Sequence, residues 1–249
     1  MICLKSKADI DVMREACRIT GLTLSHLEKM IKPGITTKEI SNAAEEFILS
    51  HGGKPSFKNY RGFPAAACVS VNDVVVHGIP NNLKLREGDI VSVDIGVLKN
   101  GYHGDAARTF AVGNVSDEAK KLIEVTRDCF FKGIEYAKPG NRIGDVSSAI
   151  QQYAEGNGYG VVRSLVGHGI GENLHEDPDV PNFGNPGKGL RLRSGMTIAV
   201  EPMINLGTYK VFQEEDGWTI KTADGKISAH YENTIAILDS GVEILTLVD

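Results

Sequence analysis

The chain has 249 residues, of which 41% are hydrophobic and 24% are charged, as expected of a globular protein that buries a sizeable core. Its net charge of −5 and the absence of basic blocks exclude a surface built for nucleic acids or anionic membranes. No apolar run approaches the ~20 residues of a membrane span, there is no signal peptide, and the four cysteines are scattered, so we expect a cytoplasmic protein.

The predicted elements alternate between pairs of helices and groups of strands. Apolar residues at helical spacing predict a helix over residues 9–31, and the capping pattern Thr36-Thr-Lys-Glu39 begins a second helix that ends near Ser50. A third helix is expected from Ser116 to about residue 137, and a fourth over about 143–155. Strands are predicted over residues 65–71, 74–77, 90–98, 102–112, 161–164, 196–204, 218–221 and 231–238.

The predicted strand 90–98 is rich in β-branched residues and contains one carboxylate, Asp94. Asn100-Gly101 is a strong signal for a two-residue hairpin, so Asp105 is expected on the partner strand. A carboxylate inside an apolar strand costs several kcal/mol to desolvate unless it is paired or binds a metal. Taken alone, Asp94 could also cap a turn and Asp105 could be a surface residue.

The second half of the sequence repeats part of the first. Residues 85–94 resemble residues 192–201 at an offset of 107, and this match aligns Asp94 with Glu201. A second match, at an offset of 106, aligns the Lys-Pro-Gly turns that precede the second and the fourth helix. We therefore expect one domain, residues 1–249, made of two halves (about 1–115 and 116–249) that pack about a pseudo-two-fold axis with acidic residues at the seam.

Four carboxylates that meet in a core repel one another unless a cation neutralises them. The partner strands carry His103-Gly-Asp105 and His230-Tyr-Glu232, and a glycine-flanked histidine, His168, offers a neutral ligand. One imidazole and four carboxylates suit Mn²⁺, Fe²⁺, Co²⁺ or Zn²⁺ and exceed the needs of one ion, which predicts a two-metal site. His103 and His230 could either support the ligands or be plainly exposed. The predicted ligands are Asp94, Asp105, His168, Glu201 and Glu232.

These motifs, in this order, resemble the methionine aminopeptidases: His77-Gly-Ile-Pro, Asp94, His103-Gly-Asp105, Gly167-His168-Gly-Ile-Gly-Glu-Asn-Leu-His175, Glu201-Pro-Met and Tyr231-Glu232-Asn-Thr. The resemblance covers essentially the whole chain. It implies the pita-bread fold, an α/β (α+β) fold in which helices cover a curved antiparallel sheet made of two duplicated halves. The short spacing from Glu201 to Glu232 and the short N-terminal part resemble the short bacterial type 1 form.

The resemblance also implies the function, a hydrolase that removes the initiator methionine from nascent proteins when the second residue is small. Asp105 and Glu232 would bridge two metal ions, Asp94 would hold one of them, and His168 and Glu201 the other. Glu201 would be the general base. His175 would stabilise the oxyanion, and His77 would contact the scissile amide. The slot for the methionine side chain would be formed by Phe57, Tyr60, Phe63, Cys68, His77, Leu174 and Trp218.

Two alternative functions share this set of residues. Prolidases and aminopeptidase P use the same ligands, but they carry a large N-terminal domain, and only about 90 residues precede Asp94 here. A catalytically silent binding module of the same fold is the other alternative. The expected partners are nascent polypeptides and a transient ribosome contact, without nucleic acid or membrane, and the chain is expected to be a monomer. Because Ile2 is not small, the protein should keep its own Met1.

Overall fold

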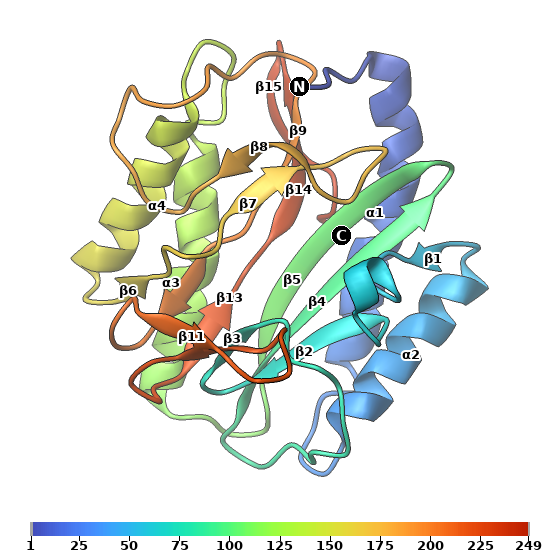
Figure 1. Cartoon of the computed structure of the whole chain (residues 1–249), viewed down its shortest axis with the longest axis vertical. Helices are drawn as coiled ribbons and strands as arrows, with labels where there is room; N and C mark the ends of the chain where they lie inside the picture. Colours follow the sequence, from blue (N-terminus) through green and yellow to red (C-terminus); the bar gives the residue numbers. More distant parts are fainter. Residues whose placement is uncertain (1, 249) are drawn as a thin grey trace.

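Two long antiparallel strands, β4 (Ile90–Lys99) and β5 (Tyr102–Ala111), form the centre of the molecule, which is described for residues 2–248 by a computed structural model (Figure 1). The strands pair along their whole length, from Ile90 opposite Ala111 to Lys99 opposite Tyr102. Asn100 and Gly101 both adopt positive φ, 53° and 84°, which confirms the predicted two-residue hairpin.

The first half of the chain packs two helices against one face of this hairpin. Strands β1 (Lys54–Pro55) and β2 (Ala67–Val71) flank β4, and helices α1 (Lys7–Glu28) and α2 (Thr37–Ser50) cover the sheet. Both helices begin with a capping box, at Ser6 and at Thr36. The core beneath them includes Leu27, Ile40, Ile48, Val91, Val93, Ile95 and Val97.

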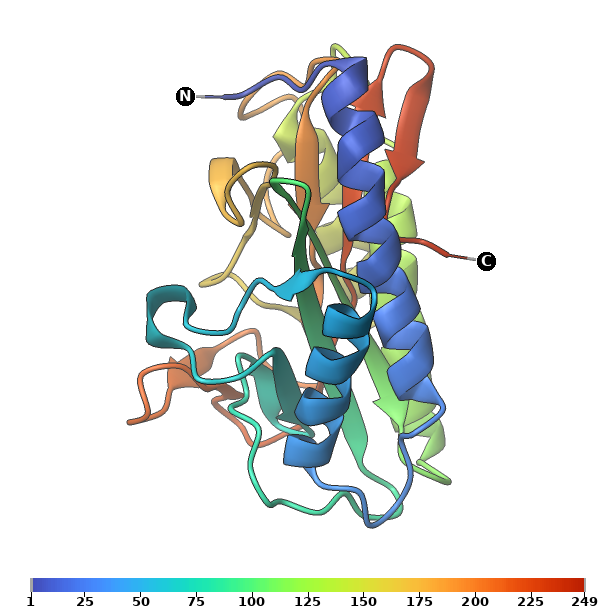
Figure 2. The same ribbon diagram turned by 90° about the vertical axis from the view of Figure 1, so that its right-hand side faces the viewer.

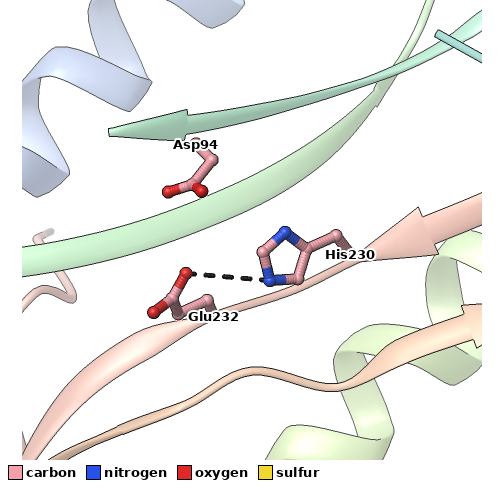
Figure 3. A group of neighbouring side chains, drawn as sticks. All are labelled: Asp94, His230 and Glu232. Carbon is pink, nitrogen blue, oxygen red and sulfur yellow. Dashed lines mark ion pairs between the residues drawn. The ribbon is translucent and has the colours of Figure 1, made fainter. Parts of the chain in front are cut away.

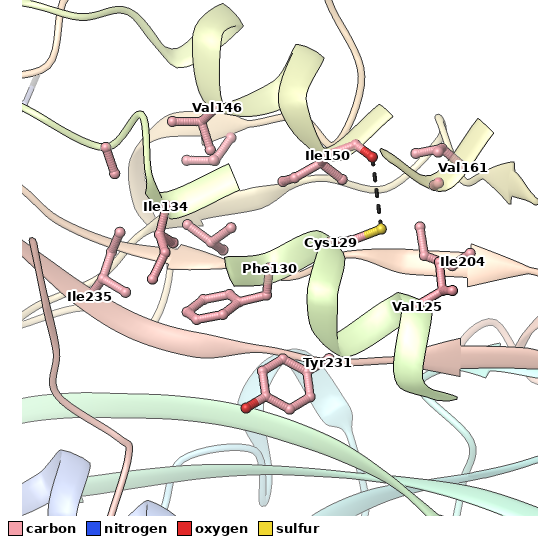
Figure 4. Packing of buried hydrophobic residues seen from close by; sticks show 14 of the residues in the cluster. Val125, Cys129, Phe130, Ile134, Val146, Ile150, Val161, Ile204, Tyr231 and Ile235 are labelled. Carbon is pink, nitrogen blue, oxygen red and sulfur yellow. Dashed lines mark hydrogen bonds between the residues drawn. The ribbon is translucent and has the colours of Figure 1, made fainter. Parts of the chain in front are cut away.

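The second half repeats this arrangement. Helices α3 (Asp117–Ile134) and α4 (Ile143–Gly156) pack together (Figure 4), and their core includes Ile198, Val200 and Ile235 of a five-stranded sheet. Phe130 is fully buried in this core and lies against Tyr231, with ring centroids 5.5 Å apart. The strands of this sheet are β7 (Gly167–Gly169), β8 (Glu176–Val180), β9 (Thr197–Val200), β14 (Asn233–Leu238) and β15 (Gly241–Ile244).

The backbone reproduces the sequence duplication at the level of single hydrogen bonds. An isolated bridge joins Thr36 to Lys84 in the first half, and its counterpart joins Arg142 to Arg191 in the second. In the same way, Gly34 N–H donates to the carbonyl of Leu85, and Gly140 N–H donates to the carbonyl of Leu192. The two Lys-Pro-Gly turns therefore dock on equivalent loops, which confirms the predicted duplicated halves of the pita-bread fold.

Two strands predicted as continuous are interrupted in the structure. The expected strand 196–204 divides into β9 and β10 (Met203–Asn205), and Glu201-Pro202 lies at the break. The expected strand 231–238 begins only at Asn233, and residues 231–232 link it to a separate strand, β13 (Ser228–His230). Proline has no N–H to give to a sheet, so the chain changes direction and sheet at Pro202. Strand β13 pairs with β10, which also pairs with β6 (Gly160–Val161).

The helices lie on one side of the sheets, and the loops that surround the candidate site lie on the other (Figure 2). A small sheet on the loop side is formed by β3 (Val74–Val76), β11 (Val211–Gln213) and β12 (Ile220–Thr222). Trp218 precedes β12 rather than lying in it, contrary to the strand predicted over residues 218–221. Among the helices of residues 2–248, none combines the length and the apolar character needed to cross a membrane.

Candidate metal centre and substrate cavity

Strand register places the two aspartates on one face of the central hairpin. Asp94 lies opposite Ala107, and Asp105 lies opposite Gly96. Side chains alternate across a strand, so Asp94 and Asp105 are diagonal neighbours on the face turned away from α1 and α2. Cys68 on β2 lies opposite Asp94 and shares this face. Val91, Val93, Ile95 and Val97 of β4 point to the helices, which explains how the strand can carry a carboxylate in its middle.

The two glutamates come from the interruptions in the second half. Glu201 follows β9, and its backbone carbonyl accepts a hydrogen bond of 2.9 Å from the Nδ2 of Asn182. Glu232 lies between β13 and β14, where its backbone exchanges two hydrogen bonds with Ala107 of β5. These two bonds join the halves directly and bring Glu232 beside Asp105. The breaks in the strands are therefore what aim both glutamates at the hairpin.

Two buried histidines complete the cluster. The Nε2 of His168 lies 3.9 Å from an oxygen of Asp105 and 3.9 Å from an oxygen of Glu201. The Nε2 of His230 lies 3.7 Å from an oxygen of Glu232 (Figure 3) and 3.8 Å from an oxygen of Glu201. Two groups of residues have ligand atoms close enough to share an ion: Asp94, His230 and Glu232, and Asp105, His168 and Glu232.

The electrostatics of the cluster favour a bound cation. Burial raises the pKa of Asp94 to about 7 and raises those of Asp105, Glu201 and Glu232 well above their usual values, with repulsion between neighbouring carboxyl groups adding to the last three. The Oδ1 atoms of Asp94 and Asp105 are buried without a hydrogen-bond partner. A buried carboxylate oxygen without a partner raises the free energy of the folded protein, and oxygen-rich sites of this kind bind divalent ions. The residues present therefore fit a divalent metal centre.

A cavity of about 160 Å³ opens above the carboxylates. Aromatic and aliphatic side chains form its walls, and Trp218 makes edge-on contacts with Phe63 and His77 at ring distances of 5.2 and 6.3 Å. Every residue that the sequence predicted for the site lines this one cavity. They are Phe57, Tyr60, Phe63, Cys68, His77, Asp94, Asp105, His168, Leu174, His175, Glu201, Trp218 and Glu232.

The structure also adds residues that sequence reasoning did not assign to the site. Arg61 lines the cavity beside Tyr60, in a short 3₁₀ turn, η1 (Tyr60–Gly62). His230 is 2% exposed, and its Nε2 has no hydrogen-bond partner, so it belongs to the cluster rather than to the surface. Its counterpart in the duplication, His103, does not line the cavity, and its Nδ1 lies 2.8 Å from the hydroxyl oxygen of Ser56. The only available signal for His230 was its place two residues before Glu232.

Comparison with known proteins gives a consistent result over the full chain. A sequence model described as metallopeptidase family M24 matches residues 11–239. A methionine aminopeptidase from Clostridium perfringens is 59% identical over 248 residues, which span 100% of both chains. The crystal structure of a methionine aminopeptidase from Thermotoga maritima superposes with a TM-score of 0.98 at 46% identity, covering 100% of both chains.

A more distant relative has the same fold but much lower sequence identity. A prolidase from Pyrococcus furiosus matches with a TM-score of 0.81 at 24% identity, and the match covers 99% of this chain but 66% of the prolidase. Because the identity is below 25%, this likeness extends to the fold alone. The full-length matches and the cluster of carboxylates and histidine at the seam agree, and the chain belongs to metallopeptidase family M24.

Proposed function

We propose that this protein is a metal-dependent aminopeptidase that removes the N-terminal methionine of polypeptides whose second residue is small. The observation that carries the proposal is the meeting of five ligand side chains at the floor of one apolar-walled cavity. The cavity is lined by aromatic rings and the thiol of Cys68, a surface that suits an unbranched thioether. The whole chain, with its two halves, would act as a single catalytic domain.

We assign the metal ligands as Asp94, Asp105, His168, Glu201 and Glu232, which would hold two divalent ions. Mn²⁺, Fe²⁺, Co²⁺ and Zn²⁺ all suit this mixture of oxygen ligands with one nitrogen. When bound, such ions polarise the scissile carbonyl and increase the acidity of water. His168 is suited to its part because its Nδ1 bonds the carbonyl oxygen of Gly169 at 2.8 Å, which leaves the lone pair of Nε2 free to face Asp105 and Glu201.

The remaining residues would handle the substrate. The Glu201 carboxylate would accept a proton from the attacking water and pass it to the departing amine as the peptide bond breaks. His175 would donate a hydrogen bond to the carbonyl oxygen as negative charge develops there. His77 would contact the scissile amide nitrogen. The free α-amino group of the substrate would lie near Asp94, which would restrict cleavage to the first residue.

The natural substrates would be nascent polypeptides that begin with methionine. The protein would bind them in the cytoplasm during a transient contact with the ribosome. We expect the protein to work as a monomer.

Substrate choice tests this proposal directly. We expect the Mn²⁺-loaded protein to release methionine from Met-Ala-Ser and to leave an Xaa-Pro peptide intact. The variant Glu201→Gln should lose at least about 100-fold in kcat, because it removes the proton acceptor. Glu214→Gln is a matched control, since Glu214 pairs with Lys221 outside the cavity. Cleavage of the Xaa-Pro peptide in preference, or full activity of Glu201→Gln, would overturn the assignment.

A further inference from the structure

Tyr60 makes a contact that its place in the wall of the cavity does not require. Its hydroxyl oxygen lies 2.9 Å from the Nδ1 of His175. The two rings are also stacked, with centroids 5.3 Å apart and planes 24° from parallel. A residue that only lined an apolar slot would need the ring but not the hydroxyl, so the hydroxyl has a separate task.

The neighbouring histidine, His168, shows how such a contact determines which ring nitrogen carries the proton. The Nδ1 of His168 lies 2.8 Å from the backbone carbonyl oxygen of Gly169. A carbonyl can only accept a hydrogen bond, so the Nδ1 of His168 carries the proton and its Nε2 keeps the lone pair. This is the tautomer required of a histidine that binds a metal through Nε2. The ring of His175 lies against that of His168, with centroids 4.2 Å apart.

We propose that Tyr60 is a positioning residue that fixes His175 in the opposite tautomer, with its hydroxyl donating to Nδ1 and the proton on Nε2. A tyrosine hydroxyl can donate where a carbonyl cannot, and within residues 2–248 His175 is the hydrogen-bond partner of this hydroxyl. The Nε2–H is then the donor that His175 offers to the cavity it lines. Two adjacent histidines thus present different atoms, His168 a lone pair and His175 a donor.

The reverse tautomer would work against the chemistry at this site. A proton on the Nδ1 of His175 would leave a lone pair on Nε2, which repels the oxygen of a substrate carbonyl instead of stabilising it. It would also leave the hydroxyl proton of Tyr60 without an acceptor among the described residues.

The backbone around Tyr60 is built to hold the ring in place. Asn59 and Arg61 adopt left-handed conformations, with φ of 68° and 49°, although neither is glycine. The turn is closed by hydrogen bonds from Asn59 N–H to the Phe63 carbonyl and from Phe63 N–H to the Tyr60 carbonyl, at 2.8 and 2.9 Å. Such conformations persist where the surrounding structure needs them, and here they set the direction of the Tyr60 side chain.

This inference rests on the role proposed for His175, and the variant Tyr60→Phe tests it. Phenylalanine keeps the stacked ring and the apolar wall but removes the hydroxyl. We expect kcat for Met-Ala-Ser to fall about tenfold, the loss of one well-placed hydrogen bond, with KM changed less than about twofold. In a His175→Ala background the same substitution should cost nothing further, because the two residues act as one unit.

Nitrogen-15 NMR of histidine-labelled, Zn²⁺-loaded protein gives a readout that does not depend on activity. We expect the proton of His175 on Nε2 in the wild type and a mixture of tautomers in Tyr60→Phe. Tyr102→Phe is a matched control, because it removes another tyrosine hydroxyl, one that bonds Asp9 at 2.9 Å outside the cavity. That variant should keep its kcat and its spectrum.

Three results would overturn the inference. They are a wild-type His175 protonated on Nδ1, an unchanged kcat in Tyr60→Phe, and an equal loss from Tyr60→Phe in the His175→Ala background. A wild-type protein that released no methionine would instead overturn the proposed function. The NMR spectrum would still decide the tautomer in that case, so the two failures are distinguishable.

Discussion

The Nη1 of Arg108 lies 2.6 Å from the backbone carbonyl oxygen of Glu232 and donates a hydrogen bond to it. Its Nη2 donates to the Oδ1 of Asn233 at 2.7 Å, and its guanidinium lies 4.2 Å from the ring centre of Tyr231. Arg108 belongs to β5 in the first half, whereas its three partners belong to the second half. One side chain therefore fastens together the two segments that carry Asp105 and Glu232.

We expect Arg108→Met to lower the free energy of unfolding by about 2–3 kcal/mol, because it removes the hydrogen bonds of the guanidinium to the Glu232 carbonyl and to Asn233, together with the contact with Tyr231. Mn²⁺ affinity should weaken in the same variant, since Glu232 loses its anchor. Urea unfolding and calorimetric titration measure the two effects. Arg127→Met is the matched control, because Arg127 is 51% exposed and its partner within residues 2–248 is Asp128, and it should cost less than about 0.5 kcal/mol. Equal effects of the two substitutions would refute the anchoring role.

The carboxylate cluster should make the metal-free protein sensitive to pH through Asp94. Its pKa is raised from 3.8 to about 7 in the folded state, mainly by burial, so between these values the folded state binds more protons than the unfolded state. The contribution of Asp94 to stability therefore falls as pH rises from about 4 to about 7. We expect Asp94→Asn to gain stability relative to the wild type across this range.

The difference between these two proteins reports the Asp94 carboxylate together with its repulsion of Asp105, Glu201 and Glu232, whose pKa values its charge helps to raise. Thermal unfolding of chelator-treated samples at a series of pH values measures the difference. Added Mn²⁺ should reverse its sign at neutral pH, since the wild type keeps the ligand that the variant lacks. A difference that stayed constant between pH 4 and pH 7 would contradict the account.

Leu174 should affect both stability and substrate binding. Its side chain is 2% exposed and forms part of the cavity wall. Leu174→Ala should cost about 2–4 kcal/mol of stability and raise KM for methionine peptides, because it opens the slot beside the thioether. Leu245 lies in the same apolar cluster but not in the cavity, so Leu245→Ala should lose comparable stability at unchanged KM. Denaturant unfolding and steady-state kinetics separate the two effects. A raised KM in both variants would contradict a specific role of Leu174 in substrate binding.

The protein itself offers a test of the rule for the second residue. Its sequence begins Met1-Ile2, and isoleucine is large and β-branched, so the enzyme should not remove its own Met1, which lies outside the described residues. Intact mass of protein expressed without a tag should include the initiator methionine. An Ile2→Ala variant should lose it under the same conditions. Loss of Met1 from the wild type would mean that the cavity accepts bulky second residues.

Much of the fold and of the candidate site could be predicted because the sequence repeats itself. The repeat aligned Asp94 with Glu201, and the Asn100-Gly101 turn fixed which strand carries Asp105. The structure adds that β4 alternates, with Val91, Val93 and Ile95 toward the helices and Asp94 on the opposite face. Composition alone made this strand look apolar on both faces.

What could not be predicted depends on contacts between residues far apart in the chain. Pro202 marks where the strand can break, but the entry of β9 and β10 into different sheets depends on pairing with distant strands, which local propensity does not reveal. The duplicated histidines His103 and His230 look equivalent in sequence, yet only His230 points its Nε2 at the carboxylates. Arg108 and Asn182, which hold the backbone of Glu232 and of Glu201, carry no motif at all.

Metal binding and methionine release, measured together, test the central claim most directly. Chelator-stripped protein is titrated with Mn²⁺ in a calorimeter, and release of methionine from Met-Ala-Ser is followed in the same samples. We predict that the cluster binds two ions per chain and that activity, absent in the stripped protein, appears as they bind. Full activity in the presence of chelator, or a wild type that binds no ion, would contradict the account.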